Sequence, residues 1–101
     1  MTSYLSDGCR DQLRSLPKRA QVLAKKAYIN WRRDRSNVGV QFKKISGPLF
    51  EARVGSEYRA LALDEGDDCW LWIWIGTNAE SKKLFDNPKQ MKAVKGKTKS
   101  S

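Results

Sequence analysis

Histidine is absent from the 101-residue chain, and cysteine occurs only twice. Without histidine the chain cannot build a Ser-His-Asp or Cys-His catalytic site, a histidine-ligated zinc site or the usual proton shuttle at neutral pH. Cys9 and Cys69 are too few for a four-cysteine zinc site or a disulfide framework. We therefore expect two reduced thiols, no metal and no other cofactor.

Long apolar runs are also missing. No run reaches the roughly 18 residues that a membrane span needs. The first seven residues lack the basic region followed by an apolar one that is typical of a secretory signal. We expect a cytoplasmic protein without a membrane partner. A length of 101 residues, with 40% apolar and 31% charged residues, is typical of one folded domain.

Acidic residues are scarce, with 11 Asp and Glu against 20 Lys and Arg, and the net charge is +9. Residues 1–48 carry eleven basic residues against three acidic ones, residues 49–80 two against seven, and residues 81–101 seven against one. Two basic blocks favour a polyanionic partner, nucleic acid or the ribosome. The alternative is a basic surface that only keeps the protein in solution.

Two helices are predicted in the first third of the chain. Ser6 can cap a helix that runs to about Ser15. Over residues 17–35, apolar residues recur at spacings of three, four and four, which predicts an amphipathic helix. These are Ala20, Leu23, Ala27 and Trp31.

After residue 39 the apolar period changes to two, and strands are predicted at 40–45, 49–54, 58–63 and 69–75. The last strand is apolar on both faces, as central strands are. Alternation would place Trp70, Trp72 and Trp74 on one face, where they would pack in the core or stack on bases.

A short helix is predicted at 78–85. We expect one α+β domain over residues 1–86, with two N-terminal helices packed on a small antiparallel β-sheet and a short C-terminal helix. The lysine-rich residues 87–101 are predicted to form a flexible tail.

Arg53 and Arg59 stand on adjacent predicted strands and lie close together if the turn between them is tight. Two guanidiniums repel unless an anion joins them. Phosphate suits their two-pronged geometry, and a carboxylate of Glu51 or Glu57 is the alternative partner. The preceding strand would extend this basic surface with Lys43 and Lys44.

Polar side chains follow the last predicted strand. Helix capping accounts for Thr77 or Asn78 without any further function. The carboxyl group of Glu80 could act as a general base.

Five segments, taken in order, resemble the RelE/ParE superfamily of bacterial toxins. They are Leu16-Pro17, Ala27-Tyr28 with Trp31, Phe42-Lys43-Lys44-Ile45, Arg53-Val54-Gly55 with Tyr58-Arg59-Ala60, and residues 72–80. The resemblance covers roughly residues 9–85. It is strongest to the branch whose members end in a Trp-Phe-Trp-Ile-Gly-Ser-His-x-x-Tyr-type segment.

The resemblance implies a toxin silenced by a cognate antitoxin. RelE-like members cleave messenger RNA in the ribosomal decoding site, whereas ParE-like members inhibit DNA gyrase. The resemblance assigns Arg59 to the scissile phosphate. It assigns backbone phosphates to Lys43, Lys44 and Arg53. The leading expectation is a RelE-like mRNA interferase that inhibits translation, with the ribosome and mRNA as partners.

Two positions depart from that branch. Asn78 stands where its members carry histidine, and Ser81 where they carry tyrosine. An amide cannot transfer protons, and a serine lacks a phenol. The candidate catalytic residues are thus Arg59, Asn78, Glu80 and Ser81. The sequence leaves open whether the chain is an enzyme. The alternatives are a non-enzymatic ParE-like gyrase inhibitor and an inactive module that binds antitoxin or RNA.

Overall fold

A computed structural model describes residues 1–96 of the chain. Its elements, in order, are β1 (Thr2–Leu5), α1 (Asp7–Ser15), α2 (Lys18–Arg33), β2 (Lys43–Ser46), β3 (Leu49–Val54), β4 (Tyr58–Asp64), β5 (Cys69–Thr77), α3 (Asn78–Phe85) and α4 (Pro88–Gly96). The strands form one sheet in the order β1-β5-β4-β3-β2, with β1 parallel to β5 and the other pairs antiparallel. The predicted α+β class is confirmed.

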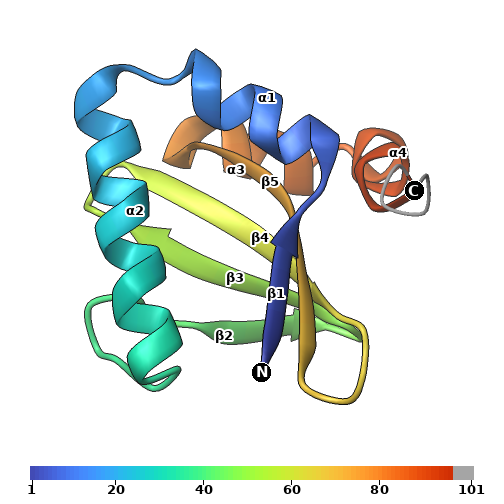
Figure 1. The fold of residues 1–101 in the computed structure, drawn as a ribbon. Helices are drawn as coiled ribbons and strands as arrows, with labels where there is room; N and C mark the ends of the chain where they lie inside the picture. The colour runs from blue at the N-terminus through green and yellow to red at the C-terminus, as the bar shows by residue number, and fades with distance from the viewer. Residues whose placement is uncertain (97–101) are drawn as a thin grey trace.

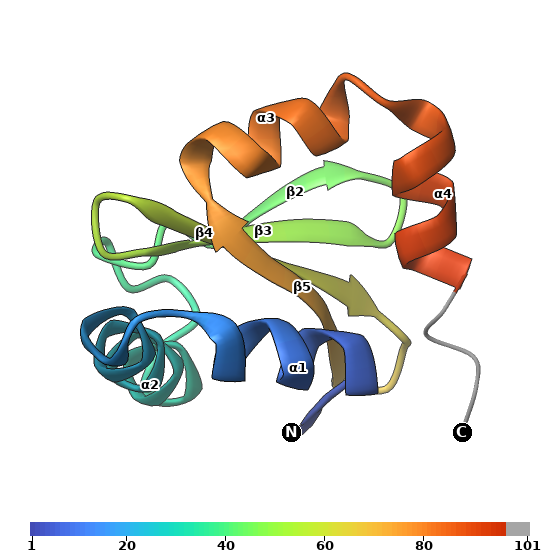
Figure 2. The same ribbon diagram turned by 90° about the horizontal axis from the view of Figure 1, so that it is seen from above.

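Helices cover both faces of the sheet. Figures 1 and 2 show α1 and α2 on one face and α3 and α4 on the other. Each face has its own apolar cluster. The cluster beneath α2 is centred on Trp31, which is 1% exposed and packs edge-on against Trp70 and Trp72. The second cluster joins Leu61 and Leu71 to Leu84 of α3 and Met91 of α4.

The predicted helices form where local signals place them. The Ser6 hydroxyl accepts a hydrogen bond from the Cys9 N–H (3.1 Å) at the start of α1. Pro17 precedes α2, which ends at Arg33, two residues before its predicted end. The helix predicted at 78–85 is α3. Among the described residues, no helix is long and apolar enough to span a membrane.

A β-bulge in β5 overturns the predicted single row of tryptophans. Leu61 pairs with Trp74 and Ala62 pairs with Trp72, so Ile73 is an extra residue in β5. Trp70 and Trp72 therefore face α2, whereas Trp74 joins the cluster on the opposite face. All three are at most 7% exposed, so they do not form an open stacking surface for bases.

The strand predicted at 40–45 begins only at Lys43. Gln41 has a positive φ of 48°, which breaks the extended backbone. Val40 is nevertheless buried, and its carbonyl accepts a hydrogen bond from the Arg53 N–H (2.6 Å). The edge strand β1 was not predicted, because its four residues are half exposed and carry no clear pattern.

The prediction of a flexible tail from residue 87 differs from the structure over its first part. Pro88–Gly96 forms α4, and Met91 is buried against the second apolar cluster. One methionine, aided by the partly buried Val94, supplies the apolar contact that the lysine-rich composition concealed. The rest of the predicted tail, 97–101, lies outside the described residues.

Candidate nucleic-acid interface

The register of the sheet brings three of the predicted cations together. Arg53 of β3 lies directly opposite Arg59 of β4, and Lys43 of β2 lies directly opposite Glu51 of β3. Because directly paired residues point to the same face and side chains alternate along a strand, all four side chains lie on the α3 face of the sheet. The predicted proximity of Arg53 and Arg59 is thus present.

We call these four residues, Lys43, Glu51, Arg53 and Arg59, the cation cluster. Glu51 is its one negatively charged member. Its Oε1 lies 3.9 Å from Lys43 Nζ and 3.9 Å from Arg59 Nε. The Glu51 side chain is 13% exposed, against 29% for Arg59 and 65% for Lys43. The carboxylate is therefore less exposed than either of the two cations that it contacts.

The two arginines are held differently. Arg53 Nε donates a hydrogen bond to the Gly55 carbonyl (3.1 Å), which anchors its guanidinium at the β3–β4 turn. Arg59 Nη1 is buried and has no hydrogen-bond partner within residues 1–96. A buried N–H without a partner is costly, so a ligand that accepts from it gains the bond that the protein does not supply.

Lys44 does not join the cluster. It lies opposite Phe50, whose ring stacks on Phe42 at 5.0 Å beneath α2. Alternation therefore places Lys43 and Lys44 on opposite faces of the sheet. The structure brings together three of the four predicted phosphate-binding residues.

The polar residues of α3 have structural contacts. Asn78 Nδ2 donates to the Ser56 carbonyl (2.9 Å), which ties the helix start to the β3–β4 turn. Glu80 accepts from the Thr77 N–H (2.8 Å) while Thr77 Oγ1 accepts from the Glu80 N–H (3.0 Å), a complete capping box. Ser81 is 4% exposed. These contacts account for Asn78 and Glu80 without catalysis.

Gly76 allows close packing on β5 next to Arg59. It is the β5 residue directly opposite Arg59. A Cβ at this position would lie 2.7 Å from the Trp74 ring and 2.8 Å from Glu80 Oε1. Because glycine has no Cβ, the Trp74 ring and the Glu80 carboxylate can pack directly against the backbone of β5 at this position.

Solved structures resemble this one over most of its length. The RelB–RelE antitoxin–toxin complex from Methanococcus jannaschii matches with a TM-score of 0.63 and 17% identity, over 80% of this chain and 96% of that chain. The chain has a RelE-like toxin fold. A copper-bound mutant toxin from Helicobacter pylori matches with a TM-score of 0.58 and 12% identity, over 79% of this chain and 97% of that one.

A third structure, the RelBE2 toxin–antitoxin complex from Mycobacterium tuberculosis, matches with a TM-score of 0.53 and 21% identity, over 76% of this chain and 96% of that one. Neither a protein-family model nor a curated protein matches the sequence significantly. The expected likeness to RelE-type toxins is therefore confirmed as a likeness of fold.

Within the RelE-like fold, Glu51 has a more central place than its sequence position indicates. Its predicted role was that of an alternative ion-pair partner for Arg53 and Arg59, whereas its carboxylate lies within 3.9 Å of both Lys43 and Arg59. The alternation of β3, which puts Glu51 and Arg53 on one face, was the available signal. Across the described residues, no group of three or more His, Cys, Asp and Glu side chains could hold a metal ion.

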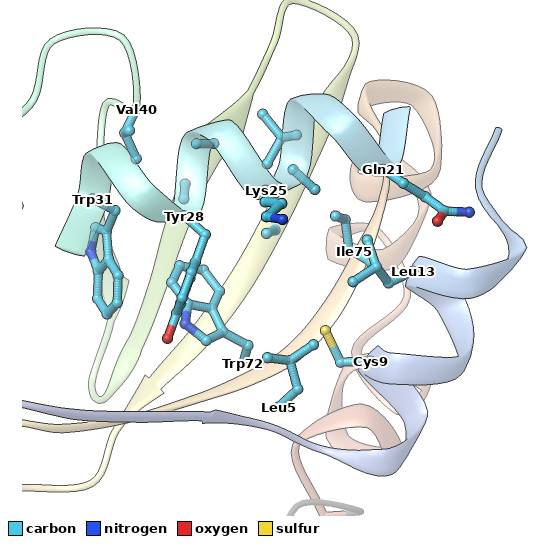
Figure 3. Close-up of a pocket in the computed structure, with 15 residues that line it drawn as sticks. Leu5, Cys9, Leu13, Gln21, Lys25, Tyr28, Trp31, Val40, Trp72 and Ile75 are labelled. Atoms are coloured by element: carbon cyan, nitrogen blue, oxygen red, sulfur yellow. The ribbon is translucent and has the colours of Figure 1, made fainter. Parts of the chain in front are cut away.

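An apolar cavity of about 370 Å³ lies between α2 and the sheet, away from the cluster (Figure 3). Two of its polar side chains have partners: the Tyr28 hydroxyl donates to Ser3 Oγ (3.0 Å), and Gln21 Nε2 donates to the Leu16 carbonyl (2.8 Å). The Trp31 Nε1, which also belongs to the lining, is buried without a partner among the described residues. Cys9 also lines the cavity, and burial raises the pKa of its thiol to about 12. Most of the side chains that line this cavity are apolar, whereas the cation cluster carries three positively charged side chains.

Proposed function

We propose that this chain is the toxin of a toxin–antitoxin pair and that it inhibits translation by cleaving mRNA on the ribosome. The single observation that carries the choice of RNA is the cation cluster, in which Arg53 lies opposite Arg59 and one terminal nitrogen of Arg59 has no partner among the described residues. The RelE-like fold supports the toxin role, and the RelB–RelE complexes support an antitoxin partner. Such a toxin would act in the cytoplasm.

The chemistry needs a fixed cation at the reacting phosphorus. The ribose 2′-oxygen attacks the adjacent phosphorus in line, its proton passes to a base, and the 5′-oxygen leaves with a proton from an acid. Negative charge grows on the non-bridging oxygens, which Arg59 would stabilise. Lys43 and Arg53 would hold neighbouring phosphates, contacts that position the message without reading its sequence. The ribosome would supply most of the orientation.

The test is primer extension on a defined message translated in a purified bacterial system. We expect new ends within the decoding site, and R59A should lower their rate of formation by about a hundredfold or more. R59K, which keeps the charge but loses the fork, should be intermediate. R33A is the matched control, because Arg33 is an exposed arginine at the end of α2. Full cleavage activity of a folded R59A variant would show that Arg59 does not act at the scissile phosphate.

A second candidate is a toxin that binds its target without cleaving RNA. The observation that favours it is that Asn78 and Glu80, two of the candidate catalytic residues, make hydrogen bonds within the protein, while Ser81 is buried. An intact message under conditions where cell growth stops would support this candidate. Stalled replication would then indicate a gyrase-directed, ParE-like activity.

A further inference from the structure

Glu51 lies where a bound phosphate of the proposed function would lie. Its carboxylate is within 3.9 Å of both Lys43 Nζ and Arg59 Nε, and it is less exposed than either of these two side chains. Arg53 adds a third positive charge next to Arg59. One carboxylate thus neutralises only part of a site built from three cations.

The contacts that hold Glu51 are long. Charge-assisted hydrogen bonds between N–H donors and carboxylates are typically about 2.7–2.9 Å, so ion pairs at 3.9 Å are electrostatic contacts without a short hydrogen bond. Arg59 Nη1, in addition, has no acceptor among residues 1–96. A phosphate group, with more acceptor oxygens than the carboxylate, would satisfy donors that Glu51 leaves unsatisfied.

We propose that Glu51 is a specificity-determining residue, which occupies the cation cluster and restricts it to ligands that bring several phosphates at once. This inference rests on the proposed function only in identifying RNA as the natural ligand. A single phosphate repels Glu51 and exchanges one anion for another, with little net gain. An RNA strand also engages Lys43 and Arg53 with neighbouring phosphates, and these contacts offset the repulsion.

The experiment compares two probes by calorimetric titration: inorganic phosphate and a short 2′-O-methylated oligoribonucleotide, which the 2′-oxygen reaction cannot cleave. For wild type we expect measurable binding of the oligonucleotide and very weak binding of phosphate. E51Q keeps the shape of the side chain and removes its charge. It should bind phosphate about tenfold more tightly, with a smaller gain for the oligonucleotide, so that the selectivity falls.

The gain must depend on Arg59. In the E51Q R59Q double variant the tighter binding of phosphate should disappear, because the Arg59 guanidinium, the principal hydrogen-bond donor to the phosphate, is then missing. D67N is the matched control for charge, because Asp67 is an exposed carboxylate in the β4–β5 turn at the opposite end of β4. D67N should leave both affinities within about twofold of wild type, because an exposed charge distant from the site contributes little.

Two results would overturn the proposal. One is unchanged phosphate affinity in folded E51Q. The other is an E51Q variant that keeps the wild-type selectivity for the oligonucleotide over phosphate but no longer cleaves RNA, which would assign Glu51 to proton transfer.

If E51Q does not fold, E51D replaces it in the test. The shorter side chain retracts the carboxylate from the cations and should give a smaller gain in phosphate affinity. Because the oligonucleotide cannot be cleaved, an inactive wild type would refute the proposed function and leave this result standing.

Discussion

At the scale of single residues, Asp68 shows how the acidic turn between β4 and β5 is neutralised. Its carboxylate accepts hydrogen bonds from the Arg35 guanidinium and from Trp70 Nε1 (3.3 Å), and the N-terminal ammonium lies 3.8 Å away. Arg35 above all, and then Trp70, hold the pKa of Asp68 below its ordinary value. The first residue of the chain and the segment that follows α2 thereby meet at one turn.

The lowered pKa of Asp68 makes the free energy of unfolding depend on pH in the acidic range. A carboxyl group whose pKa is lower in the folded state stabilises the fold above its unfolded pKa of about 3.9, and this contribution disappears as the pH falls through the folded value. D68N should therefore be less stable than wild type at pH 7, with the difference shrinking below about pH 4. Urea unfolding at a series of pH values measures it. A difference that stays constant down to acid pH would mean that the charge of Asp68 is irrelevant.

The two cysteines should react at very different rates. Cys9 is 3% exposed with a pKa raised to about 12 by burial, whereas Cys69 is partly exposed. Only the thiolate reacts quickly with disulfide reagents. Titration of the folded protein at pH 8 should modify Cys69 first, and Cys9 only when denaturant is added. C69A should then show almost no reactive thiol in its folded form, and rapid labelling of C69A would contradict the buried position of Cys9.

At the scale of elements, the start of α3 depends on Gly76. A methyl group there would meet the Trp74 ring at 2.7 Å and the Glu80 carboxylate at 2.8 Å. G76A should lower the free energy of unfolding by about 1–3 kcal/mol, through overpacking and disturbance of the capping box. Chemical denaturation followed by tryptophan fluorescence measures the loss.

Gly8 provides the matched control for Gly76. A Cβ at Gly8, in the first turn of α1, would meet nothing within 4 Å. Since alanine favours helix over glycine, G8A should leave stability unchanged or raise it by up to about 1 kcal/mol. Equal losses in the two variants would show that the close contacts at Gly76 are unimportant.

How far the sequence predicts these elements depends on how local their causes are. The helices beginning after Ser6 and Thr77 follow from caps within a few residues, and the β3–β4 and β4–β5 turns follow from glycine and acidic residues. The bulge at Ile73 has no local signal, because both neighbours of Ile73 are tryptophans that suit either face. Strand β1 and helix α4 likewise depend on partners distant in sequence.

The candidate site divides in the same way. Alternation on two neighbouring strands predicts that Arg53 and Arg59 meet, because it requires only a tight turn. The register of β2 decides which lysine joins them, and it depends on a break at Gln41 and an irregularity between Lys44 and Ser46. Sequence reasoning therefore could not choose Lys43 over Lys44. The functional roles of the cluster stay predictions.

At the scale of the whole molecule, the charges divide between two surfaces that a polyanion could use. The cation cluster lies on the sheet face that bears α3. The exposed side of α2, on the opposite face, carries basic residues that include Lys26 and Arg33. The net charge of +9 would attract a polyanion such as RNA to either surface, so net charge alone does not locate the proposed binding site.

The salt dependence of RNA binding separates the two surfaces. Each phosphate contact on single-stranded RNA adds about 0.7 to the slope of log affinity against log salt concentration. If the strand lies on the cation cluster, the K43A R53A variant should lose about 1.4 from that slope. K26A R33A removes the same charge from α2 and should change only the weak long-range attraction, which is screened beyond about 10 Å at 0.1 M salt. Equal losses in both variants would mean that RNA covers the molecule without a defined path, and a loss confined to K26A R33A would place the path on α2.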